Sequence, residues 1–146
     1  MICTRQQPEM LKSCLLSVLR QMDSTDQSDS IIVIENNDVD TSRSVVNTLK
    51  TDHPNADICY ILEPELGIPS ARQSGVDFAL QTDAQWLAFI DDDEELEEGW
   101  FDKMRAAANE FECETITGPV RYAYPNDLPI WFEATPLKNK PRGTVQ

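Results

Sequence analysis

Histidine is nearly absent from this sequence, and basic residues are few. The one histidine, His53, lies in a polar connection, where a surface role is more common than a catalytic one. We therefore do not expect a mechanism with a histidine base, or a metal site built from several histidines. Twelve lysines and arginines stand against 26 aspartates and glutamates, which gives a formal net charge of −14. That charge repels nucleic acid and anionic membrane surfaces, so we expect neither as a partner.

Paired cysteines and long apolar runs are also missing. No two cysteines form a Cys-x-x-Cys pair, and all four are scattered along the chain, at Cys3, Cys14, Cys59 and Cys113. This spacing favours small core residues of a reducing compartment over zinc ligands or a disulfide framework. No apolar run approaches the roughly 20 residues of a membrane helix, and no signal-peptide pattern opens the chain. We expect a cytoplasmic protein, free or at the cytoplasmic face of the membrane, with no membrane span.

Strand and helix signals alternate along the whole chain. Apolar runs rich in β-formers predict strands at residues 1–3, 31–34, 58–62, 86–90 and 115–120. Helical spacing and helix-start residues predict helices that begin at Pro8, near Thr41 or Ser42, at Pro69 and near Trp100. Continuous apolar strands separated by helices are typical of a mostly parallel sheet with helices on both faces. At 146 residues the chain has room for one such α/β domain.

Three consecutive aspartates are the strongest local signal. Asp91, Asp92 and Asp93 follow the expected strand 86–90 directly, and two glutamates come next. Carboxylates at such spacing repel one another unless a cation or hydrogen-bond donors lie between them. A hard divalent metal ion at the end of the strand is one interpretation. A solvated acidic loop on an acidic protein is the other, and this stretch alone does not separate the two.

Polar residues also follow the other expected strands. Thr4 and Arg5 come after the first strand, and Glu35 comes after the second. Arg72 lies in the first turns of the helix that Pro69 opens. Ligands of open parallel sheets bind outside the carboxyl ends of the strands, where all these residues are expected. Two arginines and a helix amino terminus beside an acidic metal site suit a ligand that carries phosphates.

Taken together, these segments resemble the family 2 glycosyltransferases. The resemblance covers nearly all of residues 1–125 and rests on residues 2–5, 8–19, 31–38, 67–75 and 86–95. It implies a Rossmann-like domain of the GT-A fold. It also implies transfer of a sugar from a nucleoside diphosphate sugar, of the UDP or dTDP type, to an acceptor hydroxyl on a saccharide, a lipid or another molecule.

The resemblance further implies a role for each member of the aspartate run. Asp93 is expected to bind Mg²⁺ or Mn²⁺, which bridges the diphosphate. Asp92 is expected to face the ribose, with Asp91 assisting. Metal and arginine would then neutralise the charge that builds on the leaving diphosphate.

The remaining site residues are assigned by the same resemblance. Glu35 is expected to hydrogen-bond the base. Thr4 and Arg5 are expected to flank the nucleoside, and Arg72 to lie close to the nucleotide. Gln73 is a departure, since the family usually has asparagine there.

The catalytic base is the largest departure from the family. In the family it lies in an acidic segment well downstream of the fifth strand, whereas the late carboxylates of this sequence are Asp127 and Glu133. We expect the amino-terminal, donor-binding part of a single domain, incomplete at both ends, without the base and with residues 126–146 poorly ordered. A nucleotide-binding module without transferase activity is the alternative. A calcium-responsive acidic loop ranks last, because the EF-hand spacing is absent.

Overall fold

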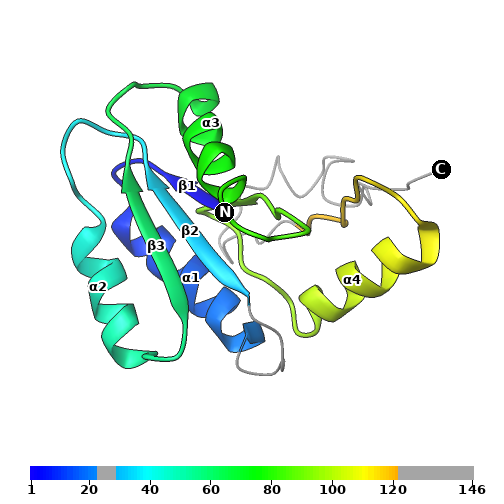
Figure 1. The fold of residues 1–146 in the computed structure, drawn as a ribbon. Helices are drawn as coiled ribbons and strands as arrows, with labels where there is room; N and C mark the ends of the chain where they lie inside the picture. Colours follow the sequence, from blue (N-terminus) through cyan, green and yellow to red (C-terminus); the bar gives the residue numbers. More distant parts are fainter. Residues whose placement is uncertain (23–28, 122–146) are drawn as a thin grey trace, which may run out of the picture. The chain divides into compact units, whose positions relative to one another are not determined.

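The computed structural model describes residues 1–22 and 29–121 (Figure 1). Two compact units divide the chain, Met1–Trp100 and Phe101–Gln146. The predictions for Asp127, Glu133 and the order of residues 126–146 concern positions outside the described residues. Among the described residues, no helix has the length and apolar character that crossing a membrane requires.

The first unit contains a parallel sheet of four strands, and this confirms the predicted α/β class (Figure 1). The strands are β1 (Ile2–Thr4), β2 (Ser30–Glu35), β3 (Asp57–Leu62) and β4 (Ile90–Asp91). Their spatial order is β3-β2-β1-β4. The chain therefore extends the sheet in one direction up to β3 and then returns to add β4 on the other side of β1. The strand order reverses between β1 and β4, and such a switch point is where open α/β sheets bind ligands.

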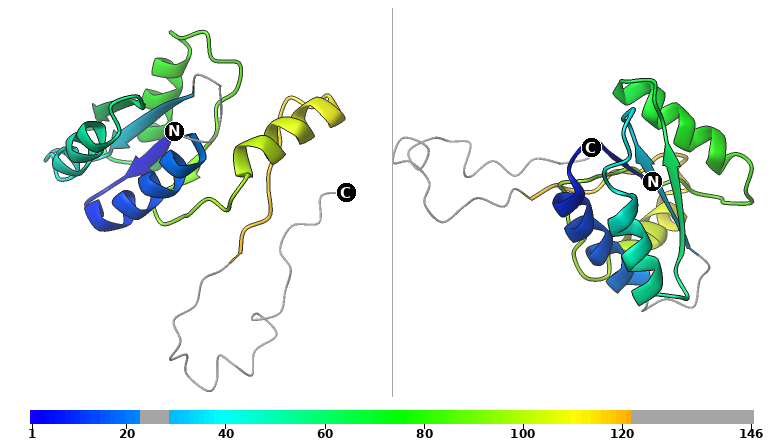
Figure 2. Two further views of the ribbon diagram at one scale, coloured as in Figure 1. Left: turned by 90° about the horizontal axis from the view of Figure 1, so that it is seen from below. Right: turned by 90° about the vertical axis from the view of Figure 1, so that its left-hand side faces the viewer.

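Helices cover both faces of the sheet (Figure 2). Helices α1 (Pro8–Met22) and α2 (Arg43–Asp52) lie on one face, and α3 (Ile68–Ala79) lies on the other. The inner face of α1 is buried where the apolar spacing predicts it, at Leu11, Cys14, Leu15, Val18 and Leu19. Pro8 opens this helix, and an acidic first turn and a basic last turn complement its dipole.

Close packing of α3 against the sheet depends on two small residues. Ala71 joins the core cluster that contains Met1, Ile32 and Ile34. At Gly75, an added Cβ would lie 1.9 Å from Met1 Sδ and 3.3 Å from Ile34 Cγ1. A side chain there would displace that of Met1 and press against Ile34, so the helix backbone lies close to the strands at this point. This contact sets the height of α3, and hence of Arg72, above the sheet.

One predicted strand is much shorter than expected. Strand pairing starts at Ile90 and includes Asp91, whereas the sequence predicts a buried strand over 86–90. Trp86 and Phe89 are 50% and 51% exposed. The pairing is short because β4 pairs with β1 alone among the described strands, and β1 has three residues. The rest of the apolar run therefore has no described strand to pair with, and no described element covers its exposed side.

The strand predicted at 115–120 is wrong, because these residues carry no strand pairing. The last helix, α4 (Trp100–Phe111), agrees with the prediction. It ends before Glu112, whose φ of 46° is the left-handed conformation that commonly closes a helix. Within the second unit, the Arg105 guanidinium lies 5.4 Å from the centre of the Phe101 ring.

The packing at Gly75 gives a stability prediction. Gly75→Val should lower the free energy of unfolding by about 1–3 kcal/mol, because the side chain overpacks the contact with Met1 and Ile34. The measurement is urea unfolding followed by circular dichroism. The matched control is Gln73→Val, which places the same side chain on the exposed side of α3. Equal losses in the two variants would contradict close packing at Gly75.

Candidate functional site

Thr4 and Asp92 meet across the point where the strand order reverses. Thr4 ends β1 and is buried, and its Oγ1 donates a hydrogen bond of 2.6 Å to Asp92 Oδ2. Asp92 follows β4 and is half-buried. The two residues are 88 positions apart in sequence, so the contact exists only because β1 and β4 are neighbours. It orients the middle aspartate of the run at the edge where a ligand is expected.

Asp91 and Arg72 meet on the other face of the sheet. The register pairs Cys3 with Asp91, and Cys3 packs in the cluster under α3. Arg72 extends from α3, and its Nη2 lies 3.7 Å from Asp91 Oδ1. The two side chains are 51% and 68% exposed, so the pair contributes little to stability. Both groups therefore remain available to a ligand.

Asp93 differs from its two neighbours. It is exposed, and no hydrogen bond or ion pair joins its side chain to another described residue. The described residues contain no group of three His, Cys, Asp or Glu side chains that could hold a metal ion alone. Mg²⁺ commonly binds through one or two carboxylates and takes its other ligands from water and substrate phosphates. A single uncommitted aspartate fits an ion of that kind, whereas an ion that needs a complete protein cage would not fit.

Helix α1 supports the aspartate run. Cys14 Sγ lies 3.5 Å from the carbonyl oxygen of Asp91, and Ser17 Oγ accepts a hydrogen bond of 2.9 Å from Leu96 N–H. Gln21 Oε1 accepts a third hydrogen bond, from Gly99 N–H. Burial, followed by the nearby charges of Asp92 and Glu94, raises the pKa of Cys14 to about 12. The sulfur therefore stays a neutral thiol that can donate to the carbonyl.

Glu35 is a fully buried carboxylate at the end of β2. It is 0% exposed. Its Oε1 accepts hydrogen bonds from Gln6 N–H at 3.2 Å and from Thr41 Oγ1 at 2.9 Å. Its Oε2 is buried and receives no hydrogen bond from the described residues. Leaving a buried polar atom unpaired costs about 1–3 kcal/mol, and more if it is charged, so this oxygen is suited to a donor from a ligand.

Arg5 reaches the same edge without contacting the other site residues. It lies exposed in the turn after β1, and no hydrogen bond or ion pair joins it to another described residue. The structure thus brings together two separate pairs, Thr4 with Asp92 and Arg72 with Asp91. Arg5, Glu35 and Asp93 share the edge with these pairs but do not bond to them.

Asn36 links the end of β2 to the connection that leads into α3, and the sequence did not reveal this role. Its Nδ2 donates to the carbonyl oxygens of Glu63 at 3.1 Å and Glu65 at 2.7 Å. Its Oδ1 accepts a hydrogen bond of 2.8 Å from Gly67 N–H. The buried amide therefore fixes the connection that leads into α3, where Gly67 has a φ of 135°. An asparagine directly after an apolar strand was the available signal, but its three partners are about 30 residues away.

Comparison with known proteins finds one family and a relative to which the chain is similar. The model of the family described as "Glycosyl transferase family 2" matches residues 1–144. The succinoglycan biosynthesis protein ExoM of Rhizobium meliloti (strain 1021) is 28% identical to the chain over 134 residues. The match covers 91% of the chain but 41% of ExoM, so the chain spans about two-fifths of that relative.

The hydrogen bond between Thr4 and Asp92 can be tested by removing the hydroxyl alone. Thr4→Val keeps the shape of the side chain and leaves Asp92 Oδ2 without its donor. We expect the free energy of unfolding to fall by about 1–2 kcal/mol, because a hydrogen bond to a charged group contributes more to stability than an average hydrogen bond. Chemical denaturation of the wild type, Thr4→Val and the control Thr4→Ser measures this. If the valine and serine variants were equally stable, the hydrogen bond would not contribute to the stability of the fold.

Proposed function

The chain belongs to glycosyl transferase family 2, and from that premise we propose that the carboxyl edge of its sheet binds a nucleoside diphosphate sugar. The observation that carries the proposal is the hydrogen bond from Thr4 to Asp92. It orients a carboxylate at the switch point of the sheet, where ligands of open α/β folds bind. With one oxygen held by Thr4, Asp92 has a second oxygen for a ribose hydroxyl.

The diphosphate has to overcome the negative charge of the chain. With a net charge of −14, the protein repels a nucleotide unless cations lie at the site. We propose that Asp93 holds Mg²⁺ or Mn²⁺, and that Arg72 and Arg5 donate to phosphate oxygens. When bound, the metal ion supplies Lewis-acid chemistry, which neutralises charge on the leaving diphosphate. The exposure of Asp93 and Arg72 supports these roles.

The nucleoside is proposed to lie between β1 and β2. Glu35 would accept a hydrogen bond from the base, and its buried Oε2 without a described donor supports this. Thr4 and Arg5 end β1 and begin the next turn, beside Glu35 at the end of the neighbouring strand. A uridine or thymidine diphosphate sugar is therefore the proposed donor, and an acceptor hydroxyl receives the sugar.

Metal-dependent stabilisation by a nucleotide tests the donor site. UDP or dTDP at a concentration about 100 times its Kd should raise the melting temperature by about 5–10 °C, but only with Mn²⁺ or Mg²⁺ present. Asp93→Asn should abolish the metal-dependent part of the shift. Glu95→Gln removes a charge from the same run at a position without a proposed role, and serves as the control. A thermal scan in which nucleotide alone gives the full shift would contradict the proposed metal site.

Turnover separates a transferase from a module that only binds the donor. Incubation of the purified chain with a UDP-sugar should release UDP, at least by slow transfer of the sugar to water. Enzyme-coupled detection of UDP measures this release. Binding of the nucleotide with no release above the rate of Asp93→Asn would favour the binding module.

A further inference from the structure

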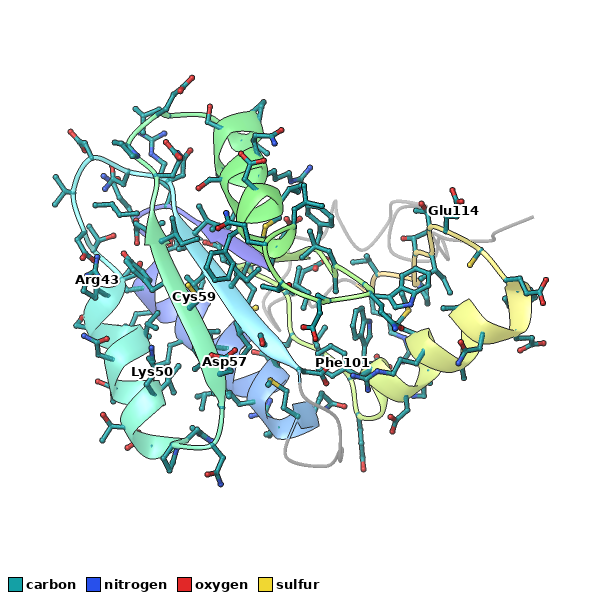
Figure 3. The ribbon with its side chains drawn as sticks, viewed as in Figure 1. Arg43, Lys50, Asp57, Cys59, Phe101 and Glu114 are labelled. Carbon is teal, nitrogen blue, oxygen red and sulfur yellow. The ribbon has the colours of Figure 1, made fainter. Side chains whose placement is uncertain are left out.

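Contacts among Asp40, Arg43 and Tyr60 stabilise the connection between β2 and α2. Asp40 Oδ1 accepts hydrogen bonds from Tyr60 OH at 2.8 Å and from Arg43 N–H at 3.1 Å. The Arg43 side chain, labelled at the start of α2 in Figure 3, also bonds Asp40. Its guanidinium lies 4.6 Å from the centre of the Tyr60 ring. Although desolvation opposes it, hydrogen bonds from Arg43 and Tyr60 hold the pKa of Asp40 below its usual value. The connection is therefore anchored at the residue that precedes Thr41.

Thr41 holds one oxygen of Glu35. Its Oγ1 donates to Glu35 Oε1 at 2.9 Å, and the backbone N–H of Gln6 donates to the same oxygen at 3.2 Å. A carboxylate oxygen has two lone pairs, so these two donors fill the accepting capacity of Oε1. Oε2 is the oxygen of Glu35 that remains without a described donor. The buried carboxylate thus has one accepting oxygen left, in a fixed orientation.

We propose that Thr41 is a positioning residue that determines which nucleobase Glu35 accepts. This inference rests on the proposed function, because it concerns the base of the same donor nucleotide. Uracil and thymine present one N–H between two carbonyl groups, and this single donor matches a single free oxygen. Guanine presents two adjacent N–H donors, which pair best with both oxygens of a carboxylate. With Oε1 occupied, Glu35 favours uridine and thymidine nucleotides over guanosine nucleotides.

Access to Oε2 requires movement of the protein around it. The oxygen is enclosed by protein, so a base reaches it only after a neighbouring group is displaced. Arg5 and Gln6 are exposed residues of the adjacent turn. Their side chains can move without breaking either bond to Oε1, because Gln6 donates from its backbone and Thr41 belongs to another connection. Displacement of these two side chains would therefore leave both hydrogen bonds to Oε1 in place.

Loss of the Thr41 hydroxyl should weaken the choice between bases. Thr41→Val removes one of the two donors that hold Oε1, so the carboxylate is free to turn and to present both of its oxygens to guanine. We expect the ratio of Kd for GDP to Kd for UDP to fall about tenfold, the effect of one hydrogen bond to a charged group. Titration calorimetry of the 146-residue chain with Mn²⁺ measures both constants. Thr41→Ser keeps the hydroxyl and should keep the wild-type ratio.

A second variant reports on the orientation of residue 35 itself. In Glu35→Gln, the donors from Thr41 and Gln6 still require an acceptor at the position of Oε1. The new amide nitrogen must then occupy the position of Oε2, where it donates to the base. Cytosine offers an acceptor where uracil has its N–H, so the preference should shift from UDP to CDP. The same substitution combined with Thr41→Val should show a smaller shift, because the amide is less constrained.

The outcomes separate the two proposals. If the wild type binds neither UDP nor GDP with Mn²⁺ present, the proposed donor site fails, and the role of Thr41 fails with it. If the wild type binds UDP but Thr41→Val keeps the GDP-to-UDP ratio, the donor site stands and the role of Thr41 is wrong. Circular dichroism and melting temperatures of each variant exclude unfolding as the cause. A folded Glu35→Gln variant that still prefers UDP to CDP would also overturn the assigned orientation.

Discussion

Backbone pairing by the three residues of β1 joins β4 to the rest of the sheet. On one side, β1 pairs with β2 from Ile2 to Thr4, and on the other side it pairs with β4 at Ile2 and Cys3. Among the described strands, β4 has no other partner. The aspartate run is therefore positioned by two backbone pairings, together with the hydrogen bonds from Thr4 and α1. The site exists only while β1 is in register on both of its sides.

The site is divided by the sheet into two sets of side chains. Thr4, Glu35 and Asp92 extend toward the face covered by α1 and α2, and Asp91 and Arg72 meet on the face covered by α3. Residues that are buried and hydrogen-bonded lie in the first set, which suits recognition of a fixed shape. The exposed ion pair lies in the second set, which suits a charged ligand that displaces solvent. One edge of the sheet thus offers both kinds of contact to a single elongated molecule.

The sequence was sufficient for the elements whose stability is local. Apolar spacing located α1, continuous apolar runs located β2 and β3, and start signals located α3 and α4. The strand predicted at 86–90 is shortened to Ile90–Asp91, because an apolar run does not reveal how long the strand beside it is. The polar residues at the sheet edge were found because they follow strands. The partners of Asn36 and the hydrogen bond from Gln6 to Glu35 were not found, because they join residues about 30 positions apart. Thr41 is only six positions from Glu35, but its bond depends on how the connection between β2 and α2 folds back.

Alternation of side chains ties the position of each aspartate to the register of β4. Asp91 and Asp92 face opposite sides of the sheet, with Arg72 on one side and Thr4 on the other. A shift of one residue in the pairing of β4 would exchange the faces of every side chain. A shift that paired Asp91 with Ile2 would place this carboxylate at the buried position of Ile90. A shift in the opposite direction would pair Ile90 with Cys3 and leave Arg72 without a carboxylate beside it. The burial of Ile90 therefore selects the one register in which all three aspartates stay at the edge of the sheet.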